Sequence, residues 1–379
     1  MIIQSKRVWV ANNFNALQVE IEDGIIKAVY PYGFQHADID YGNDRIFPGF
    51  IDVHTHGAYG FDTNDGEPDG LKYWSQHLPI DEGVTAFLPT TITQSEEVLT
   101  KAVKNVKNVV DEGYSGAEIL GIHFEGPYLD MKYKGAQPPQ FILDADVEQF
   151  KRYQKAAGGL IKYITLAPEH DRQFSLTRYC SQNGVVVSLG HSSSTYETAV
   201  LAVANGAKSM THVYNGMTAY GHRELGLVGA AFRIRDTFGE MICDGHHSTV
   251  DALNNYFKVK GADYAVMISD SLRPKGLPSG EYTSGGASIT VDDEGLAKLT
   301  GTNTIAGSTL RINKGLQVLI EKALVEVAFA VNSCTINPAR LLGVADRKGK
   351  IAVGYDGDIT VLNDNYDVVQ TYIKGEAVK

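Results

Sequence analysis

The sequence predicts an α/β protein: a (β/α)8 barrel of the TIM type with a small β-rich domain built from both ends of the chain. Three observations lead to this fold class. Short apolar segments alternate with helix-periodic segments through the middle of the chain. The two ends instead carry alternating polar and apolar residues, which is typical of half-buried strands. Histidines and carboxylates recur where the apolar segments end.

The N-terminal segment predicts β-hairpins. Residues 17–21 and 25–29 alternate and enclose Glu22-Asp23-Gly24, and Asp-Gly is a strong hairpin signal. Residues 347–379 show the same alternation of polar and apolar residues. We therefore expect residues 1–47 and 347–379 to form one small sheet beside a central domain of residues 48–346. The alternative is that these strands extend the central fold.

The middle of the chain predicts a parallel sheet, because near-continuous apolar strands separated by helices are typical of a sheet covered on both faces. Eight such units fit a closed barrel, whose functional residues gather at the C-terminal strand ends. An open doubly wound sheet is the alternative, although no GxGxxG follows the first strand to support a dinucleotide site. The expected strands lie in residues 50–53, 84–88, 119–124, 163–166, 185–189, 209–210, 241–243 and 265–268.

The helices between these strands have recognisable starts. Residues 95–111 place apolar residues on one face behind a possible capping box from Thr93 to Glu96, and Ser194 with Glu197 predicts a second such start. A long apolar-rich helix is expected over residues 312–331. Gly280, Gly285 and Gly286 follow the eighth strand, and we interpret them as a turn-rich connection rather than a cover for the site.

Composition excludes several classes of protein. A formal net charge of −11 over 379 residues argues against nonspecific binding to nucleic acid or to an anionic membrane. The 3 cysteines are widely spaced and fit reduced thiols, which favours a cytoplasmic protein. The first residues lack the apolar core of a signal peptide, and no apolar stretch is long enough to span a membrane.

The strand ends predict a metal site. His54 and His56 are one residue apart, so a strand directs both to the same face with Cα atoms roughly 7 Å apart. Later strands end in further ligand-type residues, and a parallel barrel brings all of these ends to one rim. Four histidines and two carboxylates suit Zn²⁺ or Fe²⁺, with Glu125 placed to bridge two ions or to bind one. The expected metal ligands are His54, His56, Glu125, His191, His212 and Asp270.

Asp270 has two possible roles. It is either one more metal ligand or the base that takes a proton from metal-bound water and delivers it to a leaving nitrogen. Beyond the sixth strand, Asn215, Gly216 and Arg223 suit an anion such as phosphate, and His247 has a similar choice between phosphate contact and loop packing. The competing interpretation of Arg223 is an ordinary surface arginine.

Taken together, these segments resemble the amidohydrolase superfamily and, within it, the N-acetylglucosamine-6-phosphate deacetylases. The matching segments follow the family order over nearly the whole chain. They are PGFIDVHTHG at 48–57, HFEGPY at 123–128, LAPE at 166–169, GHS at 190–192, THVYNGM at 211–217, RELG at 223–226, DGHH at 244–247 and NPAR at 337–340.

The resemblance implies a distorted (β/α)8 TIM-like barrel with a small β-sandwich domain formed by both termini. It implies a homodimer that hydrolyses the acetamide of an amino-sugar phosphate, in amino-sugar catabolism or cell-wall sugar recycling. By position, Glu125, His191 and His212 correspond to ligands of the principal metal, and Asp270 corresponds to the general acid/base. Asn215, the Gly216 backbone and His247 correspond to phosphate contacts, while Arg223 reaches the neighbouring subunit's phosphate.

The chain also departs from the family pattern. Some members lack the first histidine pair and bind one metal, whereas His54 and His56 are both present here and favour a second ion. In some members a histidine polarises the substrate carbonyl at the position of Gln137, which offers only a neutral hydrogen bond to the substrate. The segment 269–276 differs from the usual Thr-Asp-Ala sequence after strand eight.

Two rival functions stay open. The first is another amide or cyclic-amide hydrolase, or a deaminase, of the same superfamily. The fourth strand ends in Ala167-Pro168-Glu169 rather than in the lysine that many cyclic-amide hydrolases carboxylate, which disfavours this rival. The second is a non-catalytic sugar-phosphate-binding relative, which has no use for the proton shuttle that Asp270 offers.

Overall fold

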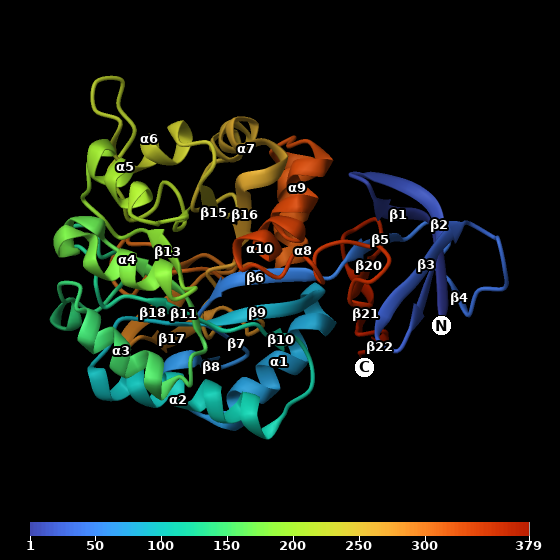
Figure 1. Ribbon diagram of the computed structural model, residues 1–379, viewed down its shortest axis with the longest axis horizontal. Coiled ribbons are helices and arrows are strands. Elements are labelled where there is room, and N and C mark those ends of the chain that lie inside the picture. Colours follow the sequence, from blue (N-terminus) through green and yellow to red (C-terminus); the bar gives the residue numbers. More distant parts are fainter. Residues whose placement is uncertain (379) are drawn as a thin grey trace.

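The computed structural model describes residues 1–378, which form a barrel surrounded by helices and a separate sheet beside it (Figure 1). The barrel strands are all parallel, and their spatial order follows the chain. Along the described chain they are β6 (Phe50–Thr55), β9 (Val84–Thr91), β11 (Ile122–Glu125), β12 (Ile161–Leu166), β13 (Val186–Leu189), β14 (Ser209–Met210), β15 (Phe238–Ile242) and β16 (Ala265–Ile268), with β10 (Glu118–Ile119) added on β9.

The first and last barrel strands meet where β6 and β16 end. The Asp270 amide donates a hydrogen bond to the His54 carbonyl at 2.8 Å. Thr55 and Ser271 form an isolated parallel β-bridge. This closure excludes the open doubly wound sheet, and the predicted barrel is confirmed. All eight expected strand segments coincide with observed strands, although the third is interrupted between β10 and β11.

Helices cover the outside of the barrel (Figure 1). They bury their apolar faces against the outward side chains of the strands, as the periodicity predicts. The α-helices are α1 (Pro68–Glu82), α2 (Glu96–Glu112), α3 (Val147–Ala156), α4 (Ser175–Gln182), α5 (Tyr196–Ala204), α6 (Gly226–Arg233), α7 (Val250–Tyr264), α8 (Ile312–Gln317), α9 (Val327–Ser333) and α10 (Ile336–Leu341). Short 3-10 segments are η1 (Thr63–Asp65), η2 (Pro139–Phe141), η3 (Pro168–His170) and η4 (Arg172–Phe174), and η5 (Val318–Lys322) is a π-helix.

Both predicted helix caps were wrong by one or two residues. Helix α2 is capped by Ser95, whose hydroxyl accepts from the Val98 amide, and α5 is capped by Thr195 in the same way. Ser194 is unavailable as a cap because its amide and hydroxyl both bond to the Ser192 hydroxyl.

The long helix expected over residues 312–331 was also wrong. Helix α8 continues into the π-turn η5 and stops, and α9 begins only at Val327. Leu324 lies between them with a left-handed φ of 52°. A leucine in this conformation is unfavourable, so the interruption reflects tertiary packing that sequence periodicity does not report.

A second sheet joins both ends of the chain, as predicted, and does not extend the barrel (Figure 1). Its order is β22-β21-β20-β5-β1-β2-β3, with β4 on β1. The predicted hairpin turn at Asp23-Gly24 has φ of 51° and 79°, the positive pair that a two-residue turn requires. The strands are β1 (Ile2–Val10), β2 (Asn13–Glu22), β3 (Ile25–Pro31), β4 (Ile39–Asp40), β5 (Arg45–Pro48), β20 (Ile359–Leu362), β21 (Val368–Ile373) and β22 (Glu376–Ala377).

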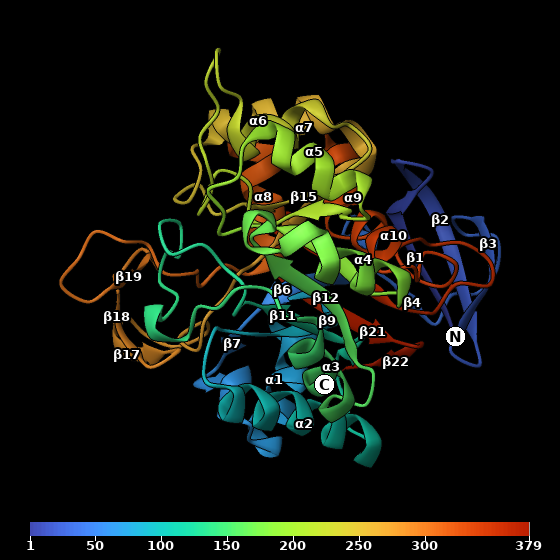
Figure 2. The ribbon, with the colours of Figure 1, turned by 60° about the vertical axis from the view of Figure 1, so that its left-hand side comes forward.

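Two small sheets lie near the C-terminal end of the barrel. β7 (Gly57–Ala58) pairs with β8 (Phe61–Asp62). β17 (Gly280–Ser284), β18 (Ala287–Val291) and β19 (Ala297–Leu299) form an antiparallel flap, seen as the orange ribbons at the left of Figure 2. Within residues 1–378, none of the helices combines the length and apolar character that crossing a membrane requires.

Candidate metal centre and substrate cavity

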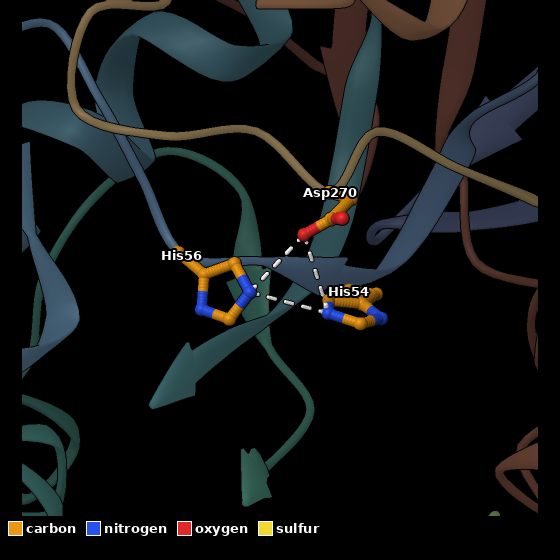
Figure 3. A group of neighbouring side chains, drawn as sticks. All are labelled: His54, His56 and Asp270. Carbon is orange, nitrogen blue, oxygen red and sulfur yellow. Dashed lines mark hydrogen bonds and ion pairs between the residues drawn. The ribbon is translucent and has the colours of Figure 1, made fainter. Parts of the chain in front are cut away.

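The first group of ligand-type side chains comes from the two strands that close the barrel (Figure 3). His54 and His56 extend from the end of β6 on the same face, and their Nε2 atoms are 3.2 Å apart. The Oδ1 atom of Asp270 lies 3.4 Å from His54 Nε2 and 3.1 Å from His56 Nε2. The predicted same-face arrangement of the two histidines is therefore observed, and Asp270 completes a compact buried triad.

The second group consists of Glu125, His191 and His212. Glu125 is the last residue of β11, and the histidines follow the ends of β13 and β14. Glu125 Oε1 is 3.2 Å from His191 Nε2 and 3.3 Å from His212 Nε2, and the two Nε2 atoms are 3.1 Å apart. The three atoms are thus all within 3.3 Å of one another.

Glu125 lies between the two groups. Its Oε1 atom is also 3.4 Å from His54 Nε2, and its Oε2 atom is 3.3 Å from His56 Nε2. Oε1 thus lies near histidines of both groups, while Oε2 lies near His56 alone among these histidines. Glu125 is therefore the carboxylate that the two groups have in common.

Three site residues hold a left-handed backbone: His191 (φ 46°), His212 (φ 28°) and Asp270 (φ 48°). This conformation costs about 1–3 kcal/mol for a residue other than glycine, and such residues cluster at functional sites. Each one follows the end of a barrel strand and turns its side chain back over the centre of the barrel. The strain therefore coincides with the ligand positions.

The outer ring nitrogens define the tautomers of three histidines. His54 Nδ1 is 2.9 Å from Glu240 Oε2, His191 Nδ1 is 2.9 Å from the Tyr133 carbonyl, and His212 Nδ1 is 3.1 Å from the Asn215 carbonyl. Carbonyl and carboxylate oxygens only accept hydrogen bonds, so Nδ1 carries the proton in each case. When the ring is neutral, each Nε2 therefore keeps its lone pair toward the centre, as metal-ligating histidines require.

The electrostatics of the centre favour a cation. Burial lowers the pKa of His54, but the carboxylates of Asp270, Glu125 and Glu240 outweigh burial and raise this pKa to about 9. Burial likewise lowers the pKa of His56, and its hydrogen bonds to Asp270 and Glu125 raise it to about 10. Positive charge is thus stabilised where the Nε2 atoms converge. Nitrogen and oxygen donors in this field fit a divalent metal ion.

The metal-ligand groups form the floor of a cavity of about 390 Å³, a volume that suits a small organic substrate. Most of the predicted site residues line it. They are His56, Glu125, Gln137, His191, His212, Asn215, Gly216, His247 and Asp270.

Two predicted residues lie elsewhere. His54 is fully buried beneath the floor, and Arg223 is exposed on the loop before α6. The chain therefore does not bring Arg223 to its own cavity. A contact with a neighbouring subunit stays a prediction.

Gln137 is fixed by two hydrogen bonds. Its side-chain amide donates to Glu125 Oε2 at 2.6 Å, and its carbonyl oxygen accepts from the Thr93 amide at 2.9 Å. The carbonyl end of the side chain is therefore occupied. The second hydrogen of the amide nitrogen has no partner among the described residues and is available to a ligand.

The predicted anion-binding residues Asn215, Gly216 and His247 all line the cavity. Gly216 has a φ of 59°, and a Cβ there would lie 3.0 Å from His191 Nδ1, so a residue other than glycine would be strained and crowded. His247 is held by Asp244, whose Oδ2 lies 2.7 Å from His247 Nδ1. Burial raises the pKa of Asp244, but the His247 hydrogen bond outweighs it and lowers this pKa. His247 is therefore held in place by an ionised carboxylate.

The flap of β17–β19 is a part of the site that the sequence interpretation missed. Gly285-Gly286 is its hairpin turn, with φ of 57° and 83°, and is not a mere connection. Ile289 and Leu299 from the flap line the cavity, together with residues 303–307, which follow the flap. The signal was a glycine pair between two alternating segments, a pattern typical of a hairpin.

Comparisons with known proteins agree on one family. Residues 45–378 match the amidohydrolase family. The N-acetylglucosamine-6-phosphate deacetylase of Bacillus subtilis (strain 168) is 40% identical over 333 residues, covering 87% of this chain and 83% of that protein. The N-acetylgalactosamine-6-phosphate deacetylase of Escherichia coli O157:H7 is 32% identical over 359 residues, covering 95% and 94%.

Solved structures show the same likeness. A mutant N-acetyl-D-glucosamine-6-phosphate deacetylase from Mycobacterium smegmatis, in complex with N-acetyl-D-glucosamine-6-phosphate, has a TM-score of 0.94 and 28% identity, covering 100% of this chain and 99% of that one. The N-acetylglucosamine-6-phosphate deacetylase of Thermotoga maritima has a TM-score of 0.90 and 30% identity, with the same coverage. The likeness therefore extends over the barrel and the terminal sheet together.

Proposed function

This chain belongs to the amidohydrolase family, and from that premise we propose that it is a metal-dependent hydrolase that converts N-acetylglucosamine 6-phosphate to glucosamine 6-phosphate and acetate. The observation that carries the proposal is the convergence of histidines and carboxylates on the floor of a cavity of substrate size. Relatives named for this reaction match the chain over 87% to 94% of its length.

The proposed metal ligands are the predicted ones. Glu125, His191 and His212 hold the principal ion, while His54 and His56 hold a second ion with Asp270. We propose Zn²⁺ or Fe²⁺, because imidazole and carboxylate donors suit both. A divalent cation bound there supplies a Lewis acid that polarises the acetyl carbonyl and acidifies water.

Asp270 is the proposed general acid/base. Burial raises its pKa, but His54 and His56 lower it, so the side chain is an ionised carboxylate able to accept a proton. It takes the proton of the attacking water as the water oxygen bonds to the acetyl carbon. When the carbon–nitrogen bond breaks, Asp270 gives that proton to the departing amine.

The chain's other residues are proposed to bind and orient the substrate. Asn215, the Gly216 amide and His247, which all line the cavity, bind the phosphate. Gln137 contacts the acetamide through its second amide hydrogen, in addition to its bond with Glu125.

Four further predictions belong to this proposal. Arg223, exposed on its own chain, completes the phosphate site of a partner subunit in a homodimer. The enzyme is cytoplasmic. Neither nucleic acid nor membrane is a partner, in keeping with the net charge of −11. The chain divides into a small domain of residues 1–47 and 347–379 and a catalytic domain of residues 48–346.

The rival functions have less support. Lysine is absent from the lining of the cavity in the part of the chain that the structure describes, which disfavours a cyclic-amide hydrolase built on a carboxylated lysine. The 4-epimer N-acetylgalactosamine 6-phosphate is a second candidate substrate, because a relative 32% identical is named for its deacetylation. This candidate changes the sugar and leaves the chemistry the same.

Acetate release tests the proposal. Protein treated with a chelator and then reloaded with Zn²⁺ or Fe²⁺ would be given both 6-phosphates and unphosphorylated N-acetylglucosamine. We expect metal-dependent release from N-acetylglucosamine 6-phosphate, less from its 4-epimer and little from the unphosphorylated sugar. Metal-loaded protein that releases acetate from none of the three would overturn the proposed substrate.

A further inference from the structure

Glu240 is a buried carboxylate that the proposed chemistry does not use. It lies on β15 with its side chain inside the barrel, beneath the metal-ligand groups, and it is 0% exposed. The neighbouring residues of β15 are apolar or glycine, so the carboxylate stands alone in its strand. A charge in this position is costly unless it is paired.

The partners of Glu240 connect it to both groups. Its Oε2 atom accepts from His54 Nδ1 at 2.9 Å and from the His212 backbone amide at 3.2 Å. Its Oε1 atom accepts from the Tyr163 hydroxyl at 2.6 Å. One oxygen thus orients His54 of the first group and also contacts the backbone of His212 in the second group.

Among the described residues, no lysine or arginine forms an ion pair with Glu240. Across residues 1–378, its recorded ion-pair partner is His54 alone. The negative charge of Glu240 is therefore balanced only by His54 and by a cation bound to His54. A carboxylate placed here for structure alone would be expected to face a basic side chain.

The two groups are supported unequally. In the second group, the Nδ1 atoms of His191 and His212 donate to neutral backbone carbonyls. In the first group, His54 donates to a carboxylate, whereas His56 Nδ1 has no partner among the described residues. A carboxylate behind a histidine raises its strength as a ligand more than a carbonyl does.

We infer that Glu240 is a positioning residue that secures the ion held by His54, His56 and Asp270, and that it thereby determines whether the chain binds two metal ions or one. It acts through His54 by fixing the ring orientation, by keeping the proton on Nδ1 and by adding negative charge behind Nε2. The inference rests on the proposed metal centre, and it does not depend on the identity of the substrate.

Metal stoichiometry under graded chelation tests the inference. Wild type, Glu240→Gln and Tyr163→Phe would be loaded with Zn²⁺, dialysed against increasing chelator and analysed for metal per chain. Gln keeps an oxygen for His54 and offers its amide to the Tyr163 oxygen, so it removes the charge with little change of shape. Tyr163→Phe is the matched control, because it removes the hydrogen bond to Glu240 Oε1 and keeps the charge.

We expect two ions in wild type and in Tyr163→Phe. Glu240→Gln should lose one ion at about 10–100-fold lower free chelator and keep the other, in line with the usual cost of losing a second partner of a ligating histidine. A global folding defect would release both ions together, so retention of one ion is specific to the positioning role.

Three results would overturn the inference: wild type that binds fewer than two ions, Glu240→Gln that keeps both ions as tightly as wild type, and loss of both ions together. Acetate release by the wild type is a separate readout. A two-ion wild type without deacetylase activity would refute the proposed substrate and leave the role of Glu240 standing.

Discussion

Two regions of this protein gather buried charges, and they balance them differently. The rim, defined as Glu125, Glu240 and Asp270 at or near the strand ends, has three carboxylates that form ion pairs only with histidines among the described residues. The junction lies between β10 and the start of β20. It consists of Glu118, Arg347, Lys348, Asp356 and Asp358.

The carboxylates of the junction are balanced by basic side chains of the junction itself. Lys348 Nζ contacts Asp358, Glu118 and Asp356 at 2.5, 2.9 and 3.0 Å, and Arg347 contacts Glu118 at 2.6 Å. The rim lacks lysine and arginine partners, so its carboxylates are balanced only by the histidines and by any cation that the histidines bind. The lesson is that a cluster of buried charges indicates a ligand when its own chain leaves it unbalanced, and indicates a structural role when the chain balances it.

The largest effect is expected from Asp270→Asn at the rim. Asn keeps the shape but neither accepts the proton of water nor returns it to the amine, so kcat should fall by about 10²–10⁴-fold. Initial rates with metal-loaded protein and the phosphorylated sugar measure this change, with thermal unfolding as the control for folding. Near-native turnover with metal bound would show that Asp270 is a ligand only.

At the junction, Lys348→Met should affect stability and leave the chemistry unchanged. The lysine side chain is 2% exposed, and its loss leaves the buried Asp358 without its basic partner, which costs about 3–5 kcal/mol. Denaturant unfolding measures the change, and the rate per folded molecule should stay close to wild type. A loss of rate without a loss of stability would mean that the distinction between the two regions fails.

Acid should weaken the junction through Glu118. Burial raises the pKa of Glu118, but Arg347 and Lys348 outweigh burial and lower it to about 2. A carboxyl with a lowered pKa stabilises the fold above its unfolded value of about 4.5, and this stabilisation disappears as the pH falls toward 2. Melting temperatures from pH 6 to pH 2 should therefore fall less steeply for Glu118→Gln than for wild type.

The smallest effect is expected from Lys314→Met. It removes a lysine–aspartate ion pair like that of Lys348, but one that is exposed rather than buried. Lys314 contacts Asp367 at 2.7 Å, but the side chains are 40% and 55% exposed. Exposed pairs contribute about 0–1 kcal/mol because water screens them. Denaturant unfolding beside Lys348→Met provides the measurement, and equal losses for the two variants would contradict the role given to burial.

Much of this organisation is visible in the sequence. The barrel, the sheet from both ends and the metal-ligand groups follow from strand periodicity and from residues at strand ends, because local alternation and strand-end position are properties of the chain itself. His54 and His56 are the clearest case, since strand geometry alone directs both to one face.

The remainder depends on contacts between distant segments. Glu240 was missed because a single carboxylate in an apolar strand does not reveal which residue, 186 positions away, it contacts. The helix starts were wrong because several hydroxyl residues precede each helix and tertiary contacts decide which one is used. The flap was undervalued because a glycine pair reveals a turn and not what the hairpin lies against.

Closure of the barrel through the bond from Asp270 to His54 has a consequence for synthesis of the chain. During synthesis, His54 leaves the ribosome more than two hundred residues before Asp270. A nascent or prematurely terminated chain can present histidines but no finished coordination pocket. The group of His54, His56 and Asp270 is thus complete only once the last barrel strand has joined the first, whereas Glu125, His191 and His212 are all synthesised before that strand.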